Sequence, residues 1–172
     1  MCAKIVAVVG NSGVGKTWLI EQLIKKLTLK KIKLAVFKHT HHKNFVIDKP
    51  GKDTYRYHTV GADNLSLFSD DKYVLIRWIN KPLSLHRIVN AYFSDVDIVL
   101  VEGLKESSFN KILIVKKISE VHRVIKSIKN TLCIVVTSNS VSYRNLKVHS
   151  KPVFQIKDIK NITNFLVSKL KL

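Results

Sequence analysis

Gly10-Asn-Ser-Gly-Val-Gly-Lys-Thr17 fits the pattern G-x-x-x-x-G-K-[ST] at every fixed position. Glycines in this pattern let the backbone turn tightly and aim successive N–H groups at phosphate oxygens. Lys16 supplies a flexible positive charge for the β- and γ-phosphates, and the Thr17 hydroxyl is a ligand for Mg²⁺. The stretch therefore predicts a phosphate cradle formed by Gly10, Asn11, Ser12, Gly13, Val14, Gly15, Lys16 and Thr17.

The residues on either side of this loop have the patterns that it requires. Residues 4–9 are apolar after Lys4 and mostly β-branched, which indicates a buried strand. From Thr17 to about Leu29 the apolar residues recur at helical spacing. A strand, a glycine loop and a helix follow one another in the order that a phosphate-binding loop needs.

The remainder of the chain alternates between apolar strands and amphipathic helices. We expect strands at residues 33–37, 64–68, 73–79, 97–101, 111–118, 131–137 and 151–156, and helices at 53–60, 83–93, 119–128 and 159–172. This alternation predicts an α/β fold, a P-loop NTPase with three α/β/α layers and a mainly parallel sheet. At 172 residues, one nucleotide-binding domain over 1–172 is expected.

Composition limits the partners of this chain. Thirty Lys and Arg against twelve Asp and Glu give a formal charge of +18, which attracts polyanions such as nucleotides or phosphorylated cofactors. We expect no signal peptide and no membrane span, and therefore a soluble cytoplasmic protein. Cys2 and Cys133 are far apart in the sequence, so we interpret them as apolar fillers and not as a disulfide or a metal site.

Residues that directly follow apolar strands have the first claim on function, because ligands of such sheets bind beyond the carboxyl ends of the strands. Asp97 and Glu102 bracket one strand and are about 17 Å apart at 3.3 Å per residue, so one of them can be near the phosphates. The carboxyl-end rule selects Glu102 for the magnesium side of the site, as a metal or catalytic residue with Lys16 and Thr17. Asn139, after the strand at 131–137, is a weaker candidate for a contact with the base.

Three histidines follow the second strand. His39, His41 and His42 could contact an anion or substrate, bind zinc or nickel, or lie in a solvated loop. Adjacent residues of an extended chain point to opposite faces, which makes His41 and His42 poor joint ligands unless the loop turns.

At this point the residues resemble a family, the molybdopterin-guanine dinucleotide biosynthesis adaptor (MobB) proteins. Three blocks carry the resemblance. They are residues 10–17, then Lys38-His-Thr-His-His42 running on to Asp48-Lys-Pro-Gly-Lys-Asp-Thr54 and Gly61-Ala62, and finally Val101-Glu-Gly-Leu-Lys105. Trp18 and Leu104 depart from the usual pattern without removing a phosphate or metal ligand.

The resemblance implies a homodimer that binds GTP with Mg²⁺ and hydrolyses it weakly. It implies an adaptor for the guanylyltransferase that joins GMP to molybdopterin, so molybdopterin or its guanine dinucleotide is a second ligand. On this interpretation the segment from Lys38 to Asp53 is a switch or substrate-contact loop, with contacts from His39, His41, His42, Lys52 and Asp53.

Three other functions remain open from the sequence. A metallochaperone GTPase would carry zinc or nickel on the histidines. A nucleic-acid-binding NTPase would use the positive charge and stack bases on Trp18, Tyr55 and Tyr57, although Trp18 is more simply expected in the core. A small-molecule kinase would need clustered arginines, which this chain does not have.

Overall fold

The computed structural model describes residues 3–40, 45, 50–138, 143 and 146–172. The chain divides into two compact units, residues 1–40 with 89–172, and residues 41–88. No helix of the described residues is long and apolar enough to cross a membrane.

The first unit is built on a seven-stranded sheet with the strand order β2-β5-β1-β6-β7-β9-β8. Neighbouring strands are parallel except for β8 and β9, which are antiparallel. The strands are β1 (Lys4–Val9), β2 (Leu34–Lys38), β5 (Ile98–Glu102), β6 (Asn110–Val115), β7 (Thr131–Val136), β8 (Lys147–Val148) and β9 (Lys151–Gln155). The predicted α/β fold with a mainly parallel sheet is confirmed.

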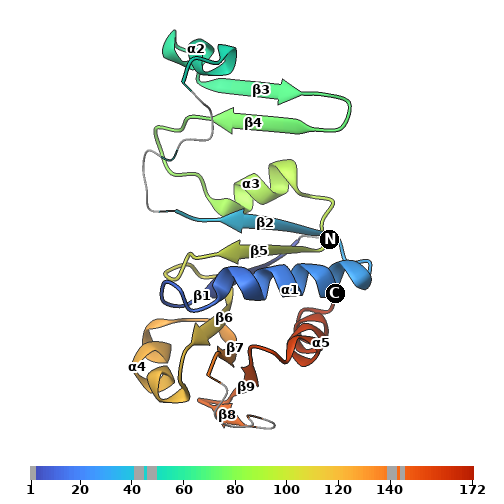
Figure 1. Cartoon of the computed structure of the whole chain (residues 1–172), viewed down its shortest axis with the longest axis vertical. Coiled ribbons are helices and arrows are strands. Elements are labelled where there is room, and N and C mark those ends of the chain that lie inside the picture. Colours follow the sequence, from blue (N-terminus) through green and yellow to red (C-terminus); the bar gives the residue numbers. More distant parts are fainter. Residues whose placement is uncertain (1–2, 41–44, 46–49, 139–142, 144–145) are drawn as a thin grey trace. The chain divides into compact units, whose positions relative to one another are not determined.

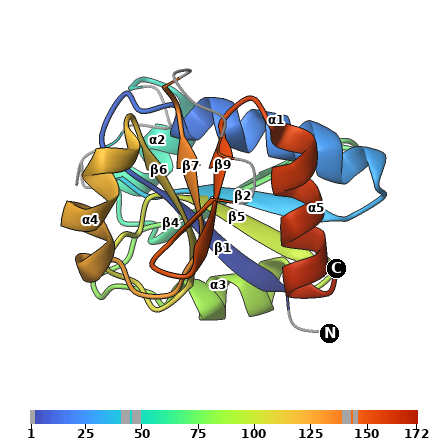
Figure 2. The same cartoon turned by 90° about the horizontal axis from the view of Figure 1, so that it is seen from below.

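Helices cover both faces of this sheet (Figures 1 and 2). On one face, α1 (Lys16–Leu29) and α5 (Ile159–Leu170) pack side by side over the central strands. Their buried residues, among them Leu23 and Leu166, join one hydrophobic cluster with strand residues such as Val8 and Leu100. The other face is covered by α4 (Val121–Val124) and by the end of α3 (Leu85–Tyr92).

The second unit contains α2 (Asp53–Thr59) and an antiparallel hairpin of β3 (Asn64–Phe68) and β4 (Tyr73–Arg77). The predicted hairpin is present, although β4 ends at Arg77 and not at Ile79. Its turn at Ser69–Lys72 is closed by a backbone hydrogen bond of 2.8 Å. In these two strands Leu65 is the buried residue. The hairpin therefore forms a small sheet of its own with little core.

Two expectations for the stretch around β6 are wrong in detail. The strand ends at Val115 and not at Ile118, because Lys116 and Lys117 leave the sheet and are exposed. The expected helix at 119–128 is a short α4 between two 3₁₀ turns, Ile118–Glu120 and Ile125–Ser127. Its β-branched residues have low helix propensity, and the Ser127 hydroxyl donates to the Val124 carbonyl.

Trp18 is not a core residue, which corrects another expectation. Its side chain is 42% exposed, whereas its neighbour Leu19 is completely buried. One turn further along α1, Leu23 is on the same buried face as Leu19. The helix phase that buries the leucines therefore leaves Trp18 at the surface.

Lys111 and Cys133 are titratable residues buried in the first unit. Lys111 is fully buried at the start of β6, and its ammonium donates to the carbonyls of Ser107, Phe109 and Lys129. Burial lowers the pKa of Lys111, and the nearby Glu106 opposes that shift. Cys133 is a buried filler, as expected, and burial raises the pKa of its thiol to about 12. Cys2 lies outside the described residues.

Candidate functional site

The glycine loop joins the carboxyl end of β1 to the start of α1. At Gly10 an added Cβ would lie 2.4 Å from the carbonyl oxygen of Ile114, so the close approach to β6 requires glycine. Gly15 is the N-cap of α1 with φ 98° and ψ 20°, a left-handed conformation that glycine adopts at little cost. The loop therefore reaches the helix N-terminus, where unpaired backbone N–H groups favour anions.

Lys16 is held by the loop that it follows. Its ammonium donates to the carbonyl of Gly10 at 3.1 Å and to that of Asn11 at 2.8 Å. Val14 is buried in the core, so its side chain secures the loop and leaves only its backbone for a ligand. Asn11, Ser12 and Gly13 are exposed along the outside of the loop.

Thr17 and Glu102 meet although 85 positions separate them. The Thr17 hydroxyl donates to a carboxylate oxygen of Glu102 at 3.1 Å. This contact follows from the sheet, because β5 is parallel to β1 and Glu102 pairs in register with Val8. Asp97 lies at the opposite end of β5, where its carboxylate accepts a backbone hydrogen bond from Lys33.

His39 lies beside this pair. Its backbone N–H donates to the Glu102 carbonyl at 3.0 Å, and its Cβ is 3.4 Å from where a Cβ of Gly103 would be. His41 and His42 lie outside the described residues. Lys52 and Asp53 are exposed residues at the start of α2 in the second unit.

Ser138 is a residue that sequence reasoning passed over in favour of Asn139. It follows β7, and its hydroxyl oxygen is buried without a hydrogen-bond partner among the described residues. The preceding Thr137 has its methyl group 3.9 Å from where a Cβ of Gly15 would be, so this strand end lies beside the phosphate loop. The carboxyl-end rule selected the right segment, but a pattern of small polar residues cannot say which hydroxyl is buried. Asn139 lies outside the described residues.

The residues of the first unit fit a magnesium nucleotide. Gly10 lies where a larger residue would collide with β6, and the helix N-terminus and Lys16 favour phosphate. The paired hydroxyl and carboxylate of Thr17 and Glu102 are oxygen ligands of the kind that Mg²⁺ prefers. The described residues contain no group of three or more His, Cys, Asp or Glu side chains that could hold a metal ion by themselves.

Comparisons with known proteins identify the family that the sequence motifs resemble. The family model for molybdopterin guanine dinucleotide synthesis protein B (MobB) matches residues 5–138. A molybdopterin-guanine dinucleotide biosynthesis adapter protein of Haemophilus influenzae is 37% identical over 111 residues, which span 64% of this chain and 62% of that relative. The adapter protein of Escherichia coli is 31% identical over 159 residues, which cover 91% of this chain and 87% of the relative.

Solved structures agree with the sequence comparisons. The crystal structure of Bacillus subtilis MobB superposes with a TM-score of 0.75 at 25% identity, covering 96% of this chain and 97% of the other. HypB from Helicobacter pylori, solved with nickel, has a TM-score of 0.51 at 15% identity and therefore shares the fold alone. The P-loop fold implies nucleotide binding in general. By sequence, motif and structure, this chain belongs to the MobB family.

Proposed function

We propose that this protein is a GTP-binding adapter in the assembly of molybdopterin guanine dinucleotide. In this role it assists a guanylyltransferase that transfers GMP to molybdopterin, and one domain spanning residues 1–172 carries the activity. The names of the relatives support the pathway. The observation that carries the nucleotide part is the hydrogen bond between Thr17 and Glu102 beside the loop that holds Lys16.

Each residue has a role in this proposal. Residues 10–17 surround the phosphates, Lys16 neutralises their charge, and Thr17 and Glu102 hold Mg²⁺ directly or through water. The backbone of His39 is bonded to that of Glu102, which supports a role for His39 as a further contact of the ligand. His41, His42, Lys52 and Asp53 remain proposed contacts of the same ligand or of molybdopterin. We expect GTP hydrolysis to be weak, because an adapter presents its nucleotide to a partner.

The hairpin supports a homodimer. Leu67, Phe68, Tyr73 and Val74 are all exposed on β3 and β4, and both strands have an edge without a strand partner among the described residues. A two-stranded sheet is marginally stable in water by itself, and an exposed edge with apolar side chains favours association. A second copy of the chain would bury these side chains.

Calorimetric titration tests the nucleotide assignment. With Mg²⁺ present, we expect GTP to bind at least tenfold more tightly than ATP, a difference of about 1.4 kcal/mol. Lys16→Ala removes the loop's charge and should abolish binding. Lys25→Ala, which removes an exposed lysine of the same helix, is the matched control and should bind normally.

The outcomes separate the competing functions. Equal affinity for ATP would contradict the GTP adapter and favour a kinase or a nucleic-acid-binding NTPase. Stoichiometric zinc or nickel in the purified protein, released with nucleotide, would favour a metallochaperone. If a guanylyltransferase forms the dinucleotide at the same rate with wild type, with Lys16→Ala and without the chain, the adapter role is wrong.

A further inference from the structure

The second unit contains a cavity that the nucleotide site does not use. Its volume is about 290 Å³, and it opens at the junction of β3, β4 and the segment that follows them. Its polar and aromatic lining consists of Asp63, Asn64, Arg77, Trp78, Asn80 and Lys81. The volume is close to the lower end for small-molecule sites in proteins, which is about 300 Å³.

Backbone pairing fixes the walls of this cavity. Asn64 and Arg77 are directly opposite each other in the hairpin, and the N–H of Trp78 donates to the Asp63 carbonyl at 3.0 Å. The two strands therefore stay paired as far as the cavity, and Arg77 projects from a regular strand and not from a free loop.

Aromatic stacking fixes Trp78. The His58 ring lies flat against the indole, with centroids 3.5 Å apart and planes 4° from parallel. His58 is itself anchored, because its Nδ1 lies 3.1 Å from the carbonyl of Ala62. The indole is therefore a fixed part of the cavity wall, and its fluorescence can report on what enters.

The charge of the lining is positive. The cavity is lined by two cations, Arg77 and Lys81, and by a single carboxylate, Asp63. Within the ranges that the structure describes, the ion pair is Lys72 with Asp71, so neither cavity cation is neutralised by a salt bridge there. Two cations against one carboxylate favour an anionic ligand, and a guanidinium offers the paired donors that suit phosphate oxygens.

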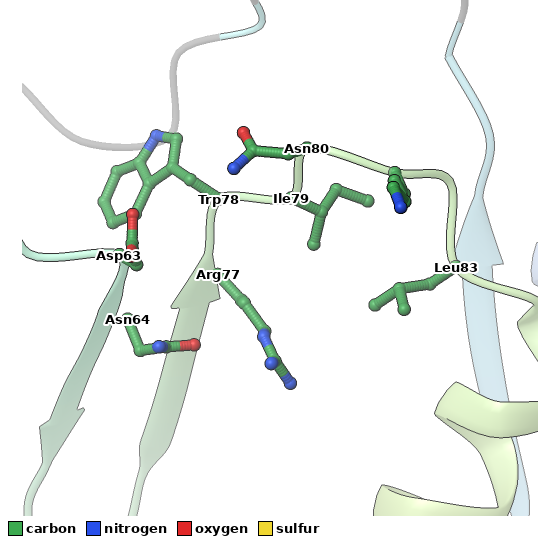
Figure 3. Close-up of a pocket in the computed structure, with 8 residues that line it drawn as sticks. Asp63, Asn64, Arg77, Trp78, Ile79, Asn80 and Leu83 are labelled. Carbon is green, nitrogen blue, oxygen red and sulfur yellow. The ribbon is translucent and has the colours of Figure 1, made fainter.

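The lining also has an apolar side. In Figure 3 the side chains of Ile79 and Leu83 point toward each other, and the side chain of Arg77 extends into the same space from β4. Asn64 and Asn80 add amide groups that can donate or accept hydrogen bonds. A free inorganic ion would leave the apolar side chains without a partner.

We propose that this cavity binds an organic phosphate monoester, with Arg77 and Lys81 on the phosphate and Ile79 and Leu83 against the organic group. The site is separate from the nucleotide loop and does not depend on GTP binding. It gives the second unit a ligand of its own.

Tryptophan fluorescence tests the proposal directly. The chain has two tryptophans, so Trp18→Phe leaves Trp78 as the only tryptophan. Lys16→Ala in the same protein removes phosphate binding at the loop. We expect phenyl phosphate to change the emission of Trp78 saturably, with an affinity at least tenfold tighter than that of inorganic phosphate. Phenol, which has no charge, should have no effect.

Charge-matched variants locate the binding. Arg77→Gln with Lys81→Gln should weaken binding of phenyl phosphate at least tenfold. Arg56→Gln with Lys72→Gln removes two charges elsewhere in the same unit and should change it less than twofold. Far-UV circular dichroism checks that both proteins fold.

Three results would overturn the proposal. The first is an emission that does not saturate below about 10 mM phenyl phosphate, because such binding is weaker than a specific site requires. The others are an affinity for inorganic phosphate equal to that for phenyl phosphate, and an equal loss of phenyl phosphate binding in the two double variants. Because every protein in this experiment lacks Lys16, failure here is distinct from failure of the nucleotide site.

Discussion

Glu102 shows how one residue acquires a role from the strand that it ends. Its carboxylate accepts a hydrogen bond from the Thr17 hydroxyl, because β5 runs parallel to β1 and ends beside the phosphate loop. Asp97 has the same functional group, but it lies at the opposite end of β5. The position along a strand, and not the chemistry of the side chain, separates the two carboxylates.

Glu102→Gln should therefore change metal dependence more than fold. Glutamine keeps the shape and can still accept from Thr17, but it removes the charge that favours Mg²⁺. We expect GTP binding with Mg²⁺ to weaken about tenfold, or about 1.4 kcal/mol, and binding in EDTA to stay the same. Calorimetry with and without Mg²⁺ measures both.

Glu21→Gln is the control, since it removes an exposed carboxylate from the surface of α1. An unchanged magnesium dependence in Glu102→Gln would show that another group holds the metal. A loss of binding in EDTA as well would indicate a structural role for Glu102.

At the scale of elements, the end of α1 has the backbone pattern of a Schellman motif. The N–H of Lys31 donates to the Thr28 carbonyl and that of Ile32 to the Leu27 carbonyl. This motif places Lys31 in the left-handed conformation, with φ 60°. Glycine is the usual residue there because other L-residues lose about 1–2 kcal/mol in that region.

Lys31→Gly should stabilise the protein. The relief of left-handed strain is partly offset by the entropy that glycine loses on folding, about 0.5–1 kcal/mol, so we expect a net gain of about 0.5–1 kcal/mol. For a chain of this size the melting temperature should rise by about 1–4 °C. Thermal denaturation followed by circular dichroism measures it.

Lys30→Gly makes the same replacement one residue earlier, at φ −88°, where there is no strain to relieve. It should leave stability unchanged or lower it. Equal gains in both variants would mean that the removed charge, and not the backbone conformation, is responsible.

The elements that sequence patterns predicted best are those with one dominant signal. β1 and β3 were predicted to the residue. A continuous apolar run between a lysine and a glycine loop, and a hairpin with an acidic turn, leave few alternatives. The two-residue β8 gives no periodic signal at all. The helix expected at 119–128 failed because apolar spacing indicated a helix while β-branched residues opposed one.

The candidate site was predictable for the same physical reason. The loop motif and the carboxyl-end rule are local patterns, and they led to Lys16, Thr17 and Glu102, which the structure brings together. The exposure of Trp18 depends on how helices and loops pack over the sheet, and so does the burial of the Ser138 hydroxyl without a hydrogen-bond partner in the described part of the chain. No short pattern in the sequence reports that packing.

At the scale of the whole molecule, the hairpin is the place to test self-association. Leu67 and Phe68 are 59% and 80% exposed, so the hairpin leaves a large apolar surface in contact with water. We expect wild type to sediment as a dimer. Leu67→Glu with Phe68→Glu should sediment as a monomer, because a symmetric dimer through the hairpin would bring four like-charged carboxylates to its interface.

Leu29→Glu, at an exposed position near the end of α1, should remain a dimer. A wild-type protein that is monomeric at every concentration tested would contradict the homodimer. A dimer that survives the double substitution would place the interface elsewhere.

The strand order has a consequence for the time at which the site can form during synthesis. β1 lies between β5 and β6. The strand that carries the phosphate loop therefore pairs with strands that follow it by about a hundred residues in the sequence. A nascent chain that has emerged only as far as β4 has the whole glycine motif but neither neighbour of β1. Pairings of such high contact order form slowly. The nucleotide loop is therefore synthesised early, but β1, which carries it, gains both neighbouring strands only after residue 115 has been synthesised.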